Sequence, residues 1–455
     1  MSDDSDYVID GDDGNTFTET TYSSYGGRLC NSLKGLCLGP LLILLSVVLL
    51  IWNEGNAVTS HRAFAKASRL VVELDGSSSS SSNEDMLVHT SGTAETQDQL
   101  VDQDFGVVPT SNVLKLQRQV EQFQWVEHQE THTRKHHGGS STRHTTYRYY
   151  QEWRDYPVDS GMFHSSSSHE NPGYFEYQSQ DYVADPVTLL VGEQQQQYTL
   201  SSSVLDKINW FTTVSESSLS VDNIQVEDAK ETAQVISGGY YIPSNQNYDS
   251  ASYSSPSIGD YRITFSEIQP QTISIVAKQE DDETLSEYFI NERTILLVEQ
   301  GSVSAAEMFR HAQASVTLQA WIIRSLGMSL MFFGFLLGSS WISTLADVFP
   351  PLGDFVGTTM ACASFIVALG LSSTIIALSW IAYRPLYAIP ILLGVIAMAG
   401  IVIVRRRKAK QQYENGTTAT VFPPLTVLGT ASAPTTSAPF GKPSEQLPIV
   451  HGEPV

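Results

Sequence analysis

The sequence predicts an α+β membrane protein with four transmembrane helices, one N-terminal and three C-terminal, and a large β-rich lumenal domain between the first and the second. The first observation is a set of four uncharged, mostly apolar stretches, at 36–52, 325–342, 355–383 and 386–404. Each has at least about 17 residues, which a helix needs to cross the hydrocarbon of a bilayer. The second observation is that the block after the first stretch contains short polar-apolar alternations, which are typical of strands. A simple cytosolic enzyme is therefore excluded.

These features divide the chain into seven segments. Residues 1–35 are expected to form a disordered acidic cytosolic tail, because the first 27 residues contain seven acidic residues and no Lys or Arg. The lumenal domain is expected to end in a helix from about residue 304. The predicted segments are the tail 1–35, the spans 36–52, 322–342, 355–383 and 386–404, the lumenal domain 53–321, and a basic, then disordered cytosolic tail 405–455.

Basic residues at the outer ends of the spans predict the orientation. Arg28 and Lys34 precede the first span, and a run from Arg405 to Lys408 follows the fourth. Because Lys and Arg mark the cytoplasmic ends of spans, both termini are expected to be cytosolic or nucleoplasmic. The large block then lies outside the cytosol.

Charge and cysteine use narrow the partners and the compartment. Residues 53–324 hold 37 of the 49 acidic residues against 17 basic ones, so this block would repel nucleic acid. The block also has no cysteine, although disulfides are common in domains exposed at the cell surface, and this favours an internal membrane system. Cys30 and Cys37 flank the start of the first span and are candidates for palmitoylation, the alternative being unmodified thiols.

Local patterns predict elements within the block. Phe123 and Trp125 alternate with polar residues, and so do Tyr147 and Tyr149 beyond a turn at Gly138-Gly139, which predicts a hairpin. A second hairpin is expected between 261–265 and 273–275, and shorter strands at 70–74 and 86–90. Residues 205–211 are expected to form a short helix. Ser304 and Glu307 have the spacing of a capping box, which predicts one helix from there to about residue 345.

Several fragments follow one another along the chain. The first comes directly after span one and contains Asn53, Glu54, Gly55, Ala57 and Val58; others are SAAEMFR at 304–310 and WIAYRPL at 380–386, which includes Arg384 and Pro385. In this order the fragments resemble the transmembrane protein 43 family, also called LUMA. One departure is Asn56, where the family commonly has Arg; His61, Arg62 or Lys66 would then have to anchor lipid headgroups.

The resemblance implies a multi-pass protein of the endoplasmic reticulum and inner nuclear membrane. Animal relatives are thought to organise complexes at the nuclear envelope with emerin and lamins. The partners expected on this basis are membrane lipids, other proteins of these membranes and further copies of the chain.

No pattern supports catalysis or a cofactor. The chain has no G-x-S-x-G nucleophile elbow and no phosphate-binding glycine loop. His128, His132 and His136 would share one face of a helix and could hold zinc, but they fall in the first predicted hairpin, so an exposed polar tip is the expected state. We therefore expect neither an enzyme nor a bound metal.

Small residues in the predicted spans favour close helix packing. Gly334 and Gly338 form a G-x-x-x-G pair, and Gly357 with Ala361 repeats this spacing in the third span. The main hypothesis is a membrane scaffold of the endoplasmic reticulum and nuclear envelope. The alternative is an oligomeric ion channel or pore, and this stays open at the level of sequence.

Overall fold

The computed structural model describes residues 9–11, 14–74, 83–244, 253–280, 283–383 and 404–405. The chain separates into two units, residues 1–388 and 389–455. All elements discussed below belong to the first unit.

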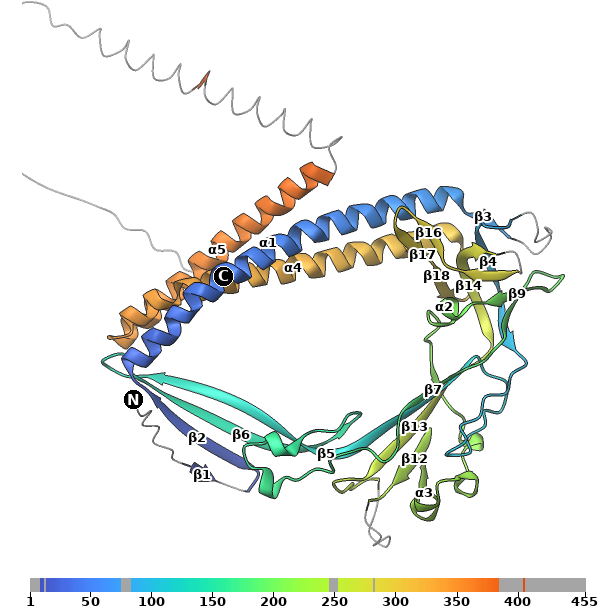
Figure 1. Ribbon diagram of the computed structural model, residues 1–455, viewed down its shortest axis with the longest axis horizontal. Helices are drawn as coiled ribbons and strands as arrows, with labels where there is room; N and C mark the ends of the chain where they lie inside the picture. Colours follow the sequence, from blue (N-terminus) through green and yellow to red (C-terminus); the bar gives the residue numbers. More distant parts are fainter. Residues whose placement is uncertain are drawn as a thin grey trace, which may run out of the picture. The chain divides into compact units, whose positions relative to one another are not determined.

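Three long helices contain three of the predicted spans (Figure 1). They are α1 (Tyr25–Leu70), α4 (Ala305–Ala346) and α5 (Pro350–Tyr383), and each is long and apolar enough to cross a membrane. α1 packs along α4, and α5 contacts both. The fourth predicted span, 386–404, lies outside the described residues apart from its last position. The short helices are α2 (Ser202–Leu205), α3 (Glu227–Thr232), η2 (Ser160–Met162), η3 (Ser166–Ser168), η4 (Glu216–Ser218) and η5 (Val221–Asn223).

The start of α4 confirms the predicted helix but not the predicted capping box. Ser304 occupies the N-cap position, yet its side chain makes no capping hydrogen bond. Glu307 instead pairs with Arg310 at 2.6 Å. The predicted helix at 205–211 is displaced as well, since α2 ends at Leu205.

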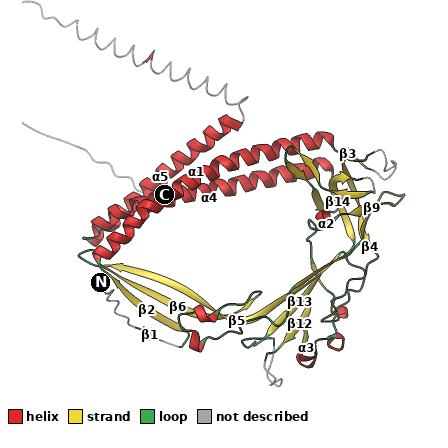
Figure 2. Cartoon of the chain, in the orientation of Figure 1, coloured by secondary structure: helices red, strands yellow, loops and turns green. Residues whose placement is uncertain are grey.

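The region between α1 and α4 is built from two antiparallel-rich sheets and one small hairpin (Figure 2). The first sheet has the order β1-β2-β6-β5-β13-β12-β11, with β7 paired to β5 and β10 to β13. Its strands are β1 (Ile9–Gly11), β2 (Thr16–Ser23), β5 (Lys115–Lys135), β6 (Ser141–Arg154), β7 (Gln180–Val183), β10 (Thr212–Thr213), β11 (Gln234–Ile236), β12 (Gly239–Ile242) and β13 (Tyr261–Ile268).

The second sheet closes on itself. Its order is β18-β14-β15-β9-β8-β4-β3, and an additional pairing of β14 with β4 joins the two ends of the inner five strands. Its strands are β3 (Val72–Glu73), β4 (Leu87–Thr96), β8 (Val187–Val191), β9 (Gln196–Leu200), β14 (Gln271–Gln279), β15 (Thr284–Ser286) and β18 (Leu297–Gln300). A separate hairpin consists of β16 (Tyr288–Ile290) and β17 (Arg293–Ile295).

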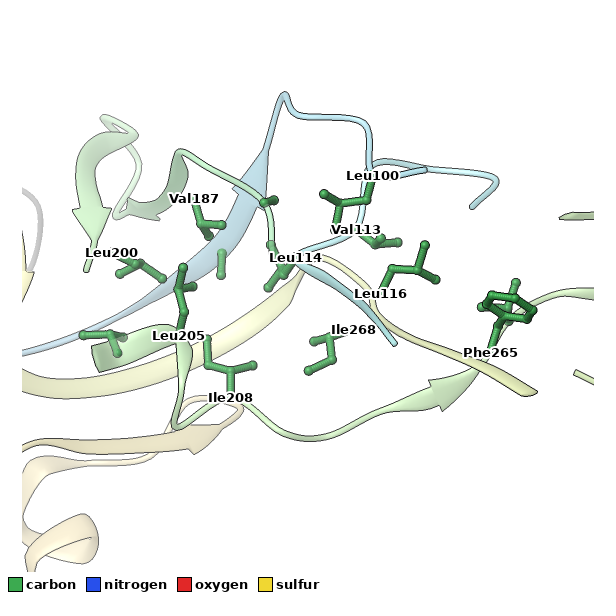
Figure 3. Close-up of a cluster of buried hydrophobic side chains, with 14 of the residues drawn as sticks. Leu100, Val113, Leu114, Leu116, Val187, Leu200, Leu205, Ile208, Phe265 and Ile268 are labelled. Atoms are coloured by element: carbon green, nitrogen blue, oxygen red, sulfur yellow. The ribbon is translucent and has the colours of Figure 1, made fainter. Parts of the chain in front are cut away.

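The main hydrophobic core lies where the two sheets meet. Alternate residues of the strands supply it, as the period of two requires. Leu114 directly precedes β5, Leu116 lies at its start, Ile268 ends β13 and Val187 begins β8, and all four are almost fully buried (Figure 3). A second, smaller cluster joins Ala63 and Ala67 of α1 to Phe309 of α4. This cluster packs the C-terminal part of α1 and the start of α4 onto the β-domain.

The first predicted hairpin is confirmed and the second is wrong in its pairing. β5 and β6 are joined by a turn in which Gly138 and Gly139 have positive φ. β13 and β14 are both present, but β13 pairs with β5 and β12 while β14 pairs with β4 and β18. Pro270 in the connecting turn explains this, because a tight hairpin turn favours residues with positive φ and proline is fixed near −65°.

The N-terminal tail differs from the prediction of disorder to residue 35. Residues 16–23 form β2, which pairs with β6 from Thr16 opposite Arg148 to Ser23 opposite Ser141, and α1 begins at Tyr25. Threonines dominate β2, and their branched side chains suit a strand. Since paired strands share hydrogen bonds, residues 16–23 and 141–148 lie on the same side of any membrane. This pairing conflicts with the prediction that the tail 1–35 and the domain 53–321 lie wholly on opposite sides of the membrane.

Candidate functional site

The three long helices meet at a buried polar junction. The apolar stretch of α1 ends at Trp52, and the next two residues, Asn53 and Glu54, are buried although both are polar. The helix continues without a break to Leu70, so these side chains are held on rigid backbone. Polar groups buried in this way need partners, and α4 and α5 supply them.

An ion pair forms the centre of the junction. Arg324 of α4 donates to Glu54 through Nε to Oε1 at 2.6 Å and through Nη2 to Oε2 at 2.8 Å. The indole Nε1 of Trp380 in α5 donates to the same Oε2 at 2.7 Å. The side chain of Glu54 is 1% exposed and that of Arg324 is 13% exposed. One carboxylate therefore links all three helices through three donors.

Neighbouring residues of α1 complete the contact. Asn53 Nδ2 donates to the carbonyl of Ala320 in α4 at 3.1 Å. A Cβ atom at Gly55 would lie 2.8 Å from the tip of the Tyr383 ring, so a larger residue there would displace this ring. Arg62, about two turns beyond Glu54, donates to the Tyr383 carbonyl at 2.6 Å.

A groove of about 540 Å³ opens beside the junction between α1 and α4. Ala57 and Val58 are buried in its floor, and Trp321 stands at its edge with the Arg324 guanidinium 4.8 Å from its ring centroid. The junction therefore combines a charged pair, two indoles and an accessible groove at one end of the apolar stretches.

Comparison with known proteins places these residues in a family. Residues 122–385, more than half of the chain, match the family described as Transmembrane protein 43. The chain belongs to the transmembrane protein 43 family. Transmembrane protein 43 of Rattus norvegicus is 31% identical over 399 residues, covering 85% of this chain and 93% of that protein.

Further relatives agree. Transmembrane protein 43 of Mus musculus is 30% identical over the same shares of both chains, and the Transmembrane protein 43 homolog of Drosophila melanogaster is 28% identical over 78% of this chain and 90% of its own. No solved structure matches the chain. The chain is therefore a transmembrane protein 43 family membrane protein with several apolar helices and a β-rich region between the first and the second.

The structure brings most of the family-signature residues to the junction. Asn53, Glu54 and Gly55 contact α4 or α5, and Ala57 and Val58 line the groove. The signature residues Arg384 and Pro385 lie outside the described residues.

Asn56, expected from the sequence to depart from the family pattern, faces away from the junction toward the β-domain. It accepts a hydrogen bond from Arg293 of β17.

Of the small residues singled out in the spans, Gly334 and Gly338 face Gly39 of α1. A Cβ atom at Gly334 would lie 2.7 Å from Ile43 of α1, and one at Gly39 would lie 2.5 Å from the Gly334 carbonyl. A Cβ atom at Gly338 would meet nothing within 4 Å, but its backbone faces Gly39. Gly357 lies near Ser343 of α4, and Ala361 lies in α5.

The remaining candidates are dispersed. Cys30 and Cys37 are exposed on α1. His128 and His132 lie exposed on β5, and among the residues that the structure describes no group of three His, Cys, Asp or Glu could hold a metal.

Sequence reasoning missed Arg324 and Trp380 as partners of Glu54. A signal was present, because Glu54 and Arg324 are opposite charges placed at the ends of two apolar stretches. An isolated charge at the boundary of a span is also satisfied by water, so the pattern alone does not select a pair.

Proposed function

We propose that the chain is a multi-pass scaffold of the endoplasmic reticulum and inner nuclear membrane that organises membrane protein complexes. The single observation that carries this is the buried junction of Glu54, Arg324 and Trp380. It fixes three apolar helices to one another directly beside the β-domain, so the domain is presented rigidly at the membrane. A β-domain that is held rigidly offers a large surface on which partner proteins can assemble, and this role needs no catalytic site.

The partners proposed are other proteins of these membranes, membrane lipids and further copies of the chain. An acidic block with 37 acidic and 17 basic residues supports protein partners over nucleic acid. Both termini are proposed to be cytosolic or nucleoplasmic, which requires that β2 leaves β6 when α1 crosses the bilayer completely.

The test is the size and composition of the complexes that the chain forms in native membranes. Membranes that contain the full chain are solubilised in mild detergent and resolved by native electrophoresis, and neighbours are identified by proximity labelling from the β-domain. We expect assemblies larger than the chain with a reproducible set of membrane proteins, and their loss in a Glu54→Gln variant that still reaches the membrane. A chain that migrates alone, with neighbours no different from those of an unrelated span in the same membrane, would contradict the proposal.

A further inference from the structure

The groove beside the junction follows one stripe on each helix. On α1 it is lined by Glu54, Val58, His61 and Ala65, at intervals of three or four residues, and on α4 by residues from Gln313 to Arg324. Such spacing places side chains on one face of a helix. The groove therefore runs along the helices for about 16 Å, since 11 residues of helix rise about 1.5 Å each.

Its position corresponds to the surface of the membrane. The apolar stretch of α1 ends at Trp52, and that of α4 begins at residue 325. Glu54 and Arg324 lie directly beyond these ends, and Trp380 lies in the last turn of the apolar stretch 355–383. The other residues that line the groove lie farther from the apolar segments. This is the level at which lipid headgroups lie.

The charges in the groove cancel, unlike those of the chain as a whole. Its lining contains one carboxylate, one guanidinium and the imidazole of His61. The whole chain has a net charge of −23. The carboxylate and the guanidinium neutralise each other in their ion pair, and a lining without net charge fits a zwitterionic ligand better than an anion or a cation.

Two indoles at the same end add a surface for a cation. Trp321 is 60% exposed and Trp380 is 45% exposed, and both line the groove. One face of the Trp321 ring already carries the Arg324 guanidinium, 4.8 Å from the ring centroid. The exposed faces of tryptophan rings also attract ammonium groups, quaternary ones included. Exposed indoles are also common where protein meets lipid headgroups.

The Arg324 guanidinium still offers a donor. Its Nε and Nη2 groups bind Glu54, and within the described part of the chain its Nη1 group makes no hydrogen bond. A phosphate oxygen is a suitable acceptor for this group.

We propose that this groove binds the headgroup of a zwitterionic phospholipid, with the ammonium group against Trp321 and Trp380 and the phosphate at Nη1 of Arg324. This goes beyond the scaffold role, because it assigns a specific lipid to one site. A bound lipid there would also bridge α1 and α4 at the level where the β-domain begins.

The experiment measures binding of short-chain lipids to the full chain in detergent micelles by isothermal titration calorimetry. The probes are dihexanoyl phosphatidylcholine, dihexanoyl phosphatidylglycerol and free phosphocholine. We expect saturable binding of the phosphatidylcholine, competition by excess phosphocholine, and weaker binding of the anionic lipid. Trp321→Ala is expected to raise Kd by about fivefold, the loss of one cation–π contact.

A groove-filling variant separates binding in the groove from partition into the micelle. Ala65→Trp places an indole in the groove without touching the ion pair, and it is expected to abolish saturable binding. Ala314→Trp adds the same indole on α4 outside the groove lining and should leave Kd unchanged. Equal or tighter binding of the phosphatidylglycerol, failure of phosphocholine to compete, or unchanged binding in Ala65→Trp would each overturn the proposal. Intact native assemblies in Ala65→Trp would show that the scaffold role stands independently.

Discussion

Glu54→Gln removes the charge at the centre of the helix junction while keeping the size of the side chain. The Arg324 guanidinium, 13% exposed, would then lose its carboxylate, and the Trp380 indole would lose a charged acceptor. Breaking a buried pair by removal of one partner costs about 3–5 kcal/mol, because it leaves the other charge buried without compensation. We expect the free energy of unfolding to fall by about this amount.

The assay is denaturant unfolding in detergent, followed by near-ultraviolet circular dichroism. The matched control is Glu307→Gln, which removes an ion pair of the same length, 2.6 Å, between side chains that are 45% and 71% exposed. Its expected cost is below about 1 kcal/mol, because water screens exposed pairs. Glu54→Gln with Arg324→Met should regain at least half of the loss, since no charge remains buried. The reasoning fails if Glu54→Gln costs no more than Glu307→Gln, or if the double variant is the least stable.

Three further predictions concern other parts of the chain. Gly39→Val should lower the unfolding free energy by about 1–3 kcal/mol, because its Cβ would lie 2.5 Å from the Gly334 carbonyl oxygen. Gly338→Ala should change the unfolding free energy little in the same assay, because its Cβ would have no atom within 4 Å. Thr18→Cys with Thr146→Cys, in a chain whose native cysteines are replaced by serine, should form a disulfide on mild oxidation, because the two residues are directly opposed in β2 and β6; a reduced pair on non-reducing gels would contradict that pairing. Burial, and then the nearby Asp102, raise the pKa of Tyr182 to about 12. The stability that comes from this raised pKa is fully present below about pH 10 and is lost as the pH rises through 12. The unfolding free energies of Tyr182→Phe and of the parent should therefore differ by a constant amount between pH 7 and 9, and a difference that changes in that range would refute the assignment.

Periodicity predicted the elements whose signal is local. The three long helices and the β5–β6 hairpin follow from continuous apolar stretches and from alternation around Gly138-Gly139, and these need no distant partner. The pairing of β13 with β5 depends on residues more than 100 positions apart. No local pattern carries that information, and the short spacing between β13 and β14 favoured the wrong partner.

The junction shows the same limit for the candidate site. The family signature identified Asn53, Glu54 and Gly55, but their physical roles depend on Ala320, Arg324 and Tyr383, which come from other helices. The disorder expected for residues 16–23 failed for a related reason. An acidic, threonine-rich segment cannot bury a core by itself, yet it forms a strand where β6 offers an unpaired edge.

The hairpin of β5 and β6 is long enough to reach both ends of α1. β5 has 21 residues and extends about 70 Å, and α1 has 46 residues and extends about 69 Å. At the hairpin tip, Lys135 pairs with Asp347 at 2.9 Å, and Arg28 at the start of α1 pairs with the same carboxylate. The tip therefore lies beyond one end of the apolar stretch 36–52, while the β-domain core lies beyond the other.

A bilayer that contained the apolar stretch of α1 at full depth would place hydrocarbon beside the polar strands of this hairpin. Each Arg or Lys side chain on a lipid-facing strand costs about 2–4 kcal/mol at mid-depth. The tip contacts and a full crossing by α1 are therefore alternatives. The cross-link between positions 18 and 146 distinguishes them: its formation in native membranes selects the arrangement in which the N-terminal strand stays on the hairpin. Its formation in detergent alone selects full crossing, with the hairpin detached from the N-terminal segment.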